Sequence, residues 1–353
     1  MSDIARRKSD HLDLAIAGDV GFRRTTSLFE CIRLVHNALP ELRFADITLT
    51  TTVLGKPLRA PLLIAGMTGG TERAGHINQE LAAVAEHRGL AFGLGSQRPM
   101  LLDATVARTF QVRGVAPTAL LLGNIGVVQA TQASRQQLVD LVAGVDADAL
   151  CVHLNPAMEL IQTDGDRDFR GCLERLGELA SDFPVPIVAK ETGCGLSAQV
   201  AKRLREHGVR HADVSGAGGT SWVALEAQRN PPPQSALGEQ FSEWGIPTAA
   251  SVALVSAQGF ETVFATGGVS SGLEVAKAIA LGATAAGIAR PVLQALESGG
   301  PRRVHELFDT VERELRVAMF LVGAADLAAL GRVPRVLTGD LEAFIEQASE
   351  ATP

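Results

Sequence analysis

One short stretch of the chain concentrates residue types that bind anions and metal ions. Residues 151–170 read CVHLNPAMELIQTDGDRDFR, and an apolar run that ends at Val152 leads directly into His153, Asn155 and Glu159. A carboxylate is a ligand for Mg²⁺, and His and Asn side chains can hydrogen-bond to an anion. Because Glu159 stands alone, a Mg²⁺ held there would take its other oxygens from a substrate diphosphate and water. A glutamate that only stabilises a helix start is an equal alternative.

The aspartates that follow do not form a second metal site by their spacing. Asp164, Asp166 and Asp168 lack the glycine position and the closing glutamate of a Ca²⁺ loop. We interpret them as turn residues that could support the neighbouring site.

Glycine-rich segments further along the chain indicate a phosphate site. The sequence reads SGAGGTSW at residues 215–222, TGGVS at 266–270 and ARP at 289–291. A glycine turn exposes backbone N–H groups, and a helix that starts just after it adds its positive end. A single glycine pair more often only permits a tight turn, but three such segments together favour phosphate binding.

A second set of donors would suit a second anion. Arg98 follows an apolar run, and Arg7 and Lys8 stand near the start of the chain. The planar fork of arginine and the point charge of lysine suit a diphosphate. Taken alone, the Arg6–Lys8 run is more typical of a solvated charged segment. The candidate donors for this site are Arg7, Lys8, Ser96, Arg98, His153 and Asn155.

These residues need a scaffold that brings distant segments together, and the apolar pattern predicts one. Eight short apolar runs alternate with amphipathic segments that suit helices, such as residues 77–88 and 198–207. The runs are residues 62–65, 90–94, 119–122, 149–152, 186–189, 211–214, 262–265 and 284–288. This alternation predicts a closed (β/α)₈ barrel, whose active site lies at the carboxyl ends of its strands. A doubly wound open sheet is the alternative.

The remaining segments predict one domain. Residues 1–60 form an N-terminal extension with one or two helices and a hairpin of residues 47–54 and 58–60, residues 61–300 form the barrel, and residues 301–353 form a C-terminal helical segment. Within that segment, residues 302–330 carry a helical pattern. Residues 229–243 contain three consecutive prolines; we predict an irregular, mobile lid there.

Composition excludes several classes. The chain has 353 residues, 46% of them hydrophobic, 36 glycines, no tyrosine and a net charge of −7. These values argue against disorder and against a nucleic-acid-binding surface. No apolar run is long enough for a membrane helix, and the start shows no secretory signal, so we predict a cytoplasmic protein with reduced cysteines.

Eight motifs in this order resemble the type 2 isopentenyl diphosphate isomerases, and the resemblance spans nearly the whole chain. They are R-K-S-D-H at 7–11, M-T-G-G at 67–70, G-S-Q-R at 95–98, N-I-G at 124–126, H-L-N-P at 153–156, S-G-A-G-G-T-S-W at 215–222, W-G-I-P-T at 244–248 and G-I-A-R-P at 287–291. The resemblance implies a homo-oligomeric, tetrameric or octameric FMN enzyme with a (β/α)₈ barrel. It implies interconversion of isopentenyl and dimethylallyl diphosphate with reduced FMN and Mg²⁺, and NADPH as reductant.

The resemblance also implies roles for single residues. FMN would be held by Ala65, Met67, Thr68, Gly69, Ser96, Asn124, Lys190, Ser215, Thr220, Gly267, Gly268, Ala289 and Arg290. The substrate would be held by Arg7, Lys8, His11, Ser96, Arg98, His153, Asn155 and Met158, and Mg²⁺ by Glu159. Lys190, His153 and Glu159 would act in catalysis, with the flavin itself as acid and base.

Two departures from the family pattern leave alternatives open. Met158 stands where the family usually has Gln, and Ser270 where many members have Arg. A thioether hydrogen-bonds poorly, so a divergent flavoenzyme of secondary metabolism acting on another prenyl diphosphate is the main alternative. A non-catalytic flavin- or phosphate-binding protein is a third interpretation. A 2-hydroxy acid oxidase would need a histidine base, and His153 is better used on phosphate.

Overall fold

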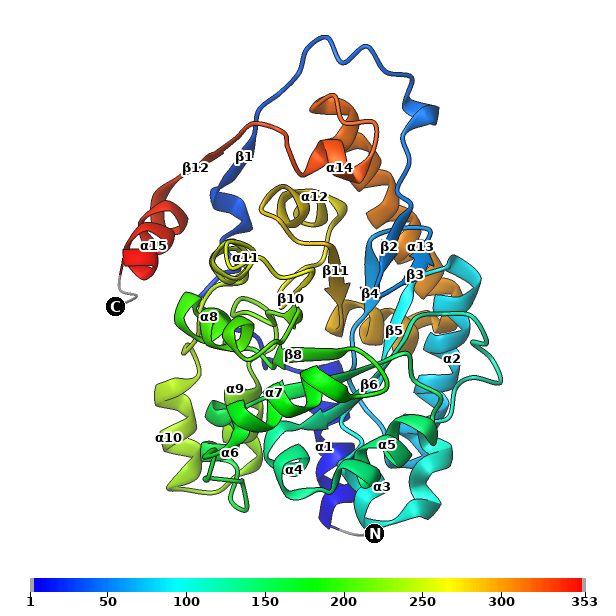
Figure 1. Ribbon diagram of the computed structural model, residues 1–353, viewed down its shortest axis with the longest axis vertical. Helices are drawn as coiled ribbons and strands as arrows, with labels where there is room; N and C mark the ends of the chain where they lie inside the picture. The colour runs from blue at the N-terminus through cyan, green and yellow to red at the C-terminus, as the bar shows by residue number, and fades with distance from the viewer. Residues whose placement is uncertain (1–2, 351–353) are drawn as a thin grey trace.

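Eight short parallel strands close into a barrel in the computed structural model, which describes residues 3–350 (Figure 1). Pairing of Ala286 in the last strand with Leu62 in the first completes the ring. This closure confirms the (β/α)₈ barrel and excludes the open sheet. The strands are β4 (Leu62–Ile64), β5 (Ala91–Gly93), β6 (Leu121–Gly126), β7 (Ala149–Leu154), β8 (Ile187–Glu191), β9 (His211–Asp213), β10 (Thr262–Thr266) and β11 (Ala285–Ile288).

Three strands run further than the apolar pattern indicates. β6, β7 and β8 continue through Asn124, His153 and Lys190, which the sequence places just after the strands. In the ladder His153 pairs with Lys190, and Asn124 pairs with Cys151. Backbone pairing does not depend on side-chain polarity, so the polar residues belong to rigid strand backbone rather than to loops.

Helices surround the barrel and join its strands. Those between β4 and β11 are α2 (Glu72–Arg88), α3 (Arg98–Leu102), η3 (Ala104–Thr109), α4 (Val127–Gln132), α5 (Arg135–Ala143), α6 (Pro156–Ile161), α7 (Cys172–Asp182), α8 (Ala198–Glu206), α9 (Trp222–Arg229), α10 (Gln234–Phe241), α11 (Thr248–Ser256) and α12 (Gly272–Ala280). The prediction of an irregular segment at 229–243 is wrong in part, because α10 begins just after the prolines. Proline is well tolerated at a helix start, where its missing N–H has no partner to lose.

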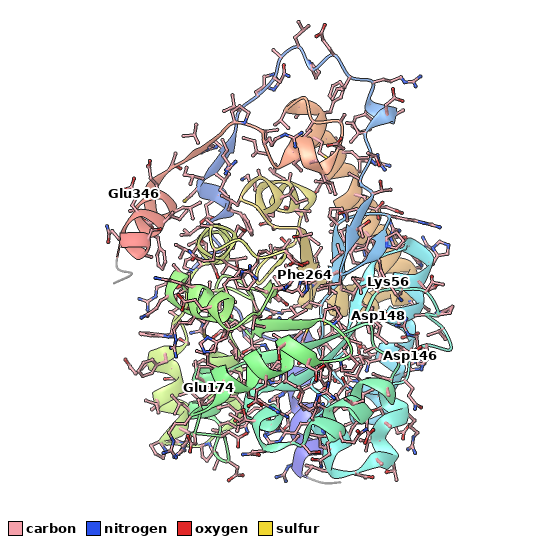
Figure 2. All side chains as sticks on the ribbon, in the orientation of Figure 1. Lys56, Asp146, Asp148, Glu174, Phe264 and Glu346 are labelled. Atoms are coloured by element: carbon pink, nitrogen blue, oxygen red, sulfur yellow. The ribbon has the colours of Figure 1, made fainter. Side chains whose placement is uncertain are left out.

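The N-terminal extension contributes a helix and a hairpin that closes one end of the barrel. It contains α1 (Asp3–Ala17), η1 (Phe29–Cys31), β1 (Ile32–Leu34), η2 (Phe44–Asp46) and the hairpin β2 (Thr51–Val53) and β3 (Lys56–Leu58). The hairpin is confirmed, but its first strand is shorter than predicted and its second begins two residues earlier than predicted. Val53 and Leu58 join the apolar cluster inside the barrel that includes Phe264, so the hairpin closes one end (Figure 2).

The sequence pattern predicted a helical C-terminal segment, and this prediction is wrong in part, because the segment also contains a strand. α13 (Arg290–Leu321) is kinked at Gly299 and Gly300, and α14 (Leu327–Leu330) and α15 (Gly339–Glu350) follow. Between them β12 (Arg335–Leu337) pairs antiparallel with β1. This pairing joins opposite ends of the chain, so no local pattern reveals it. The β1–β12 ribbon lies at the opposite end of the molecule from α1 (Figure 1).

Two properties of the described residues bear on the composition-based predictions. No helix within residues 3–350 has the length and apolar character needed to cross a membrane. The four cysteines, Cys31, Cys151, Cys172 and Cys194, are all unpaired.

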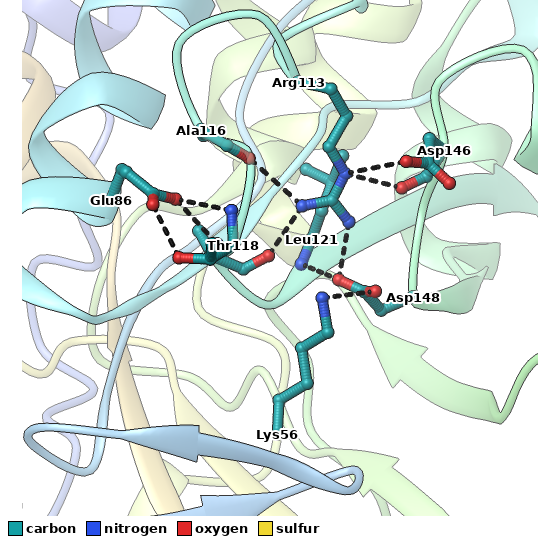
Figure 3. Close-up of polar contacts among 9 residues, drawn as sticks. Lys56, Glu86, Arg113, Ala116, Thr118, Leu121, Asp146 and Asp148 are labelled. Atoms are coloured by element: carbon teal, nitrogen blue, oxygen red, sulfur yellow. Dashed lines mark hydrogen bonds and ion pairs between the residues drawn. The ribbon is translucent and has the colours of Figure 1, made fainter.

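An ionic network fixes the hairpin and the start of β6 (Figure 3). Arg113 donates to Asp148 at 2.6 Å and to the carbonyls of Ala116 and Ala119. Asp148 also accepts from the backbone N–H of Leu121 at 2.8 Å and pairs with Lys56 of the hairpin at 2.7 Å. Burial opposes the charge of Asp148, but these donors lower its pKa on balance.

Replacing Asp148 by Asn should therefore destabilise the protein by about 1–3 kcal/mol at pH 7, because the buried donors lose a charged acceptor. Since the folded-state pKa is lowered, the effect should shrink as the pH falls through that pKa. Urea unfolding at several pH values checks this. Asp146→Asn is the matched control, because the Asp146 side chain is 86% exposed. An equal loss in both variants would contradict the assignment.

Candidate active site

A cavity of about 650 Å³ lies at the carboxyl ends of the barrel strands. Residues that end or follow each of the eight strands line it, and α1 contributes Arg7, Lys8, His11, Leu12 and Ala15. This is where (β/α)₈ enzymes carry their active sites.

With one exception, the residues that the sequence assigns to FMN, substrate or Mg²⁺ lie on this cavity. The walls include Ala65, Met67, Thr68, Ser96, Arg98, Asn124, His153, Asn155, Met158, Glu159, Lys190, Ser215, Thr220, Gly267, Gly268, Ala289 and Arg290, besides Arg7, Lys8 and His11. Gly69 is the exception, because its α-carbon faces the ring of Phe110. The individual roles of these residues remain predictions.

One side of the cavity is built from glycine turns. Gly218, Gly267 and Gly268 have φ angles of 116°, 103° and 75°, in the region that favours glycine. A β-carbon on Gly218 would lie 2.2 Å from the N atom of Ser27, and one on Gly268 would lie 2.7 Å from the carbonyl oxygen of Gly218. The turns therefore pack backbone against backbone, and a side chain at either position would separate them.

The long helix α13 starts on the same side. Its N-cap, Ala289, provides no side-chain acceptor for the first N–H groups. A helix start of this kind attracts a phosphate. The Arg290 guanidinium, expected at the phosphate, instead donates to the carbonyls of Ala15 and Gly18 and ties the end of α1 to the barrel. Ser270 is bonded to Glu274 through both its N–H and its hydroxyl.

The opposite side carries an interlocked polar cluster. Asn155 donates to one oxygen of Glu159 at 2.7 Å, and the Asp166 N–H donates to the other at 2.7 Å. The Asp166 carboxylate accepts from Gln129 at 2.5 Å and pairs with Arg98 at 3.3 Å. Asp166 thus supports the cluster, in agreement with its interpretation from the sequence. Gln129 was not identified from the sequence.

The helix α1 brings its own charges to this cluster. Lys8 donates to the carbonyl of Ser96 at 2.8 Å and lies over the Phe110 ring at 5.2 Å. His11 hydrogen-bonds to the fully buried Glu226 at 2.7 Å and packs edge-on against Trp222. Burial, assisted by the charge of Arg7, lowers the pKa of Lys8 to about 7. The contacts of His11 with Glu226 and Trp222 were not predicted, because they depend on α1 docking beside α9.

Between the two sides lies Lys190, whose charge has a buried partner. Its Nζ is 2.7 Å from the carboxylate of Asp213, which also accepts from the Thr266 hydroxyl at 2.5 Å. Asp213 is only 2% exposed. Its signal in the sequence was a carboxylate inside the apolar run of residues 211–214.

The hydrogen bonds of Asn124 determine which His153 nitrogen carries the proton. The Asn124 amide nitrogen donates to the carbonyl of Leu94 at 3.0 Å, so its oxygen accepts from Nδ1–H of His153 at 2.8 Å. Burial, followed by the charges of Lys190, Lys8 and Arg98, lowers the pKa of His153 to about 3. Neutral His153 therefore presents Nε2 as an acceptor and must gain a proton before it can donate to an anion.

Binding of inorganic pyrophosphate should raise the pKa of Lys8 above 7, because the anion favours the charged amine. At pH 6 Lys8 already holds its proton, whereas at pH 8 it should gain one on binding. Titration calorimetry at pH 8 in two buffers of different ionisation enthalpy measures this uptake. We expect up to about one proton more for the wild type than for Lys8→Met. Equal uptake in both proteins would refute the role of Lys8.

Comparisons with known proteins agree with this geometry. A family model described as FMN-dependent dehydrogenase matches residues 2–155 and 156–334. An isopentenyl-diphosphate delta-isomerase of Nostoc sp. is 45% identical over 328 residues, which cover 92% of this chain and 93% of that protein. One of Synechococcus sp. is 46% identical over 342 residues, 95% of this chain and 97% of that protein.

Solved structures share the fold at lower identity. A lactate oxidase of Pediococcus acidilactici superposes with a TM-score of 0.66 at 16% identity, over 95% of this chain and 94% of that one. A mandelate oxidase variant gives a TM-score of 0.64 at 19% identity, over 96% and 98% of the two chains. These likenesses support the fold alone. From the family model and the relatives above 40% identity, the chain belongs to the FMN-dependent dehydrogenase family and, within it, to the family of isopentenyl-diphosphate delta-isomerases.

Proposed function

We propose that this chain interconverts isopentenyl diphosphate and dimethylallyl diphosphate, with reduced FMN, Mg²⁺ and NADPH as the reductant. The observation that carries the proposal is a single cavity with glycine turns on one side and, on the other, a cationic cluster formed by Arg7, Lys8 and Arg98 together with Glu159. A nucleotide phosphate and a substrate diphosphate would occupy the two sides. The names of the relatives support the same reaction. A homo-oligomer and a cytoplasmic location remain predictions.

The cavity residues fit FMN. The close-packed turns at Gly218, Gly267 and Gly268 and the uncapped start of α13 suit its phosphate. Ala65, Met67 and Thr68 provide a wall for the ring. When bound, reduced FMN would supply the acid and base of the reaction.

Lys190 contributes a fixed positive charge on the cavity wall. Its ion pair with Asp213, whose carboxylate is itself held by the Thr266 hydroxyl, keeps the amine in place. A positioned cation stabilises negative charge that develops on a neighbouring group without having to reorient. We assign Lys190 to that role at the polar edge of the flavin.

The cationic cluster fits a diphosphate with one Mg²⁺. Asn155 and the Asp166 N–H occupy one acceptor position on each oxygen of Glu159, so lone pairs remain for a metal. Within residues 3–350 no group of three or more His, Cys, Asp or Glu side chains could hold a metal ion. Substrate and water oxygens would therefore complete the coordination of Mg²⁺. Arg7, Lys8 and Arg98 lie on the cavity to balance the remaining charge.

The isomerisation adds a proton to one carbon and removes one from another, through a tertiary cation on the substrate that water would trap. The helix α1 covers the cavity, and Met158 and Trp222 add apolar surface to its walls. Excluding water in this way protects the reacting carbons. His153, with a pKa of about 3, is a weak base, which argues against abstraction of a proton from a 2-hydroxy acid.

Replacing Glu159 by Gln should lower kcat/KM for isopentenyl diphosphate by on the order of 100-fold or more, because Mg²⁺ loses its carboxylate ligand. Anaerobic assays with reduced FMN and Mg²⁺ measure the product. Glu174→Gln, on the outer helix α7, is the matched control and should retain full activity (Figure 2). Absence of product from the FMN-loaded wild type would refute the proposal.

A second candidate, a divergent enzyme for another prenyl diphosphate, is favoured by Met158, which lines the cavity where the family usually has Gln. A small side cavity behind Met158 has a volume of only about 10 Å³, which leaves room for a single water molecule. That side cavity is too small to accept a further isoprene unit.

Under the proposed reaction, Met158→Gln should change kcat/KM for isopentenyl diphosphate by less than about threefold, well under 1 kcal/mol. Assays of both proteins across a panel of prenyl diphosphates check this. A rise of about tenfold or more with isopentenyl diphosphate would instead favour the second candidate.

A further inference from the structure

Gln162 carries a buried amide with no partner. Its Nε2 atom is one of two buried side-chain polar atoms among the described residues that lack a hydrogen bond, and the residue is only 5% exposed. The other such atom, Oγ of Ser256, lies away from the cavity, whereas Gln162 lines it. A buried donor without an acceptor is unfavourable, so an acceptor that arrives with a ligand would remove the cost.

The position of Gln162 points to the diphosphate side. It caps the end of α6, and its backbone N–H donates to the carbonyl of Met158 at 3.0 Å. Residues three, four and seven positions apart share a helix face, so Gln162 follows Glu159, Met158 and Asn155 on the face that lines the cavity. Met158 cannot donate a hydrogen bond, which leaves Gln162 as the next donor along this face.

The neighbouring polar side chains already have partners. Asn155 donates to Glu159, and Arg98 and Gln129 both contact Asp166. Glu159 accepts from Asn155 and from the Asp166 N–H. Gln162 differs from all of these in having a buried side-chain nitrogen with no partner at all.

We infer that Gln162 is a substrate-binding residue whose side-chain N–H donates to a diphosphate oxygen. This inference rests on the proposed function and adds a residue to it. A diphosphate offers only acceptors at this end of the substrate, while the alkene offers none. An amide also adds a hydrogen bond without adding charge beside Arg7, Lys8 and Arg98, where a further cation would be repelled.

Replacing Gln162 by Met, which keeps its length and removes the amide, separates a binding role from a structural one. In the FMN-loaded protein with Mg²⁺, Gln162→Met should bind inorganic pyrophosphate about tenfold more weakly by calorimetry. Without ligand its unfolding midpoint should be unchanged or higher, because an unpartnered buried donor is gone. The KM for isopentenyl diphosphate should rise with little change in kcat. Gln132→Met, outside the cavity, should alter none of these values.

Pyrophosphate affinity within about twofold of the wild type would overturn the inference, and so would a lower unfolding midpoint with unchanged affinity. If Gln162→Met does not fold, Gln162→Glu replaces the donor with a charge at pH 8 and should weaken pyrophosphate binding further. The proposed reaction can fail independently of this inference. If pyrophosphate binding depends on Gln162 but isopentenyl diphosphate gives no product, the isomerisation is refuted and the diphosphate contact stands. A wild type that does not bind pyrophosphate would overturn both.

Discussion

Pairing between the first and last barrel strands is the constraint on which the site depends. Because β11 bonds to β4, the carboxyl ends of all eight strands meet around one opening. The glycine turns after β9 and β10 and the polar ends of β6 and β7 come from segments far apart in sequence. An open sheet would spread them along an edge. Closure instead places them across one cavity from each other.

The polar residues in the barrel strands are tolerated because each has a partner inside the same layer. Lys190 is paired with Asp213, and His153 with Asn124. Burying an isolated charge or amide in a barrel core would be costly, and pairing offsets that cost. The same pairing fixes the side chains before any ligand arrives. Charge and hydrogen-bond direction are therefore set by strand backbone, which moves less than loops do.

The helix α1 completes the site from outside the barrel. Lys8 reaches the carbonyl of Ser96, His11 reaches Glu226, and Arg290 holds the carbonyls of Ala15 and Gly18. These contacts turn an open rim into a covered cavity and bring cations to the side that carries Glu159 and Arg98. Burial, and after it repulsion from the charge of Arg7, lowers the pKa of Lys8. A ligand with several negative charges would relieve that repulsion.

The sequence by itself determined the barrel and most of the residues on its rim. Apolar runs that end in glycine or polar residues mark strands and their carboxyl ends, since burial on both faces requires continuous apolar sequence. His153, Glu159 and the Gly267–Gly268 turn were found in this way. The tertiary structure alone decided which groups are partners: Asp213 with Lys190, Glu226 with His11, and β12 with β1. It also decided that the amide of Gln162 is left without one. Such contacts join residues distant along the chain, and local patterns report burial and backbone preference but not which surfaces meet.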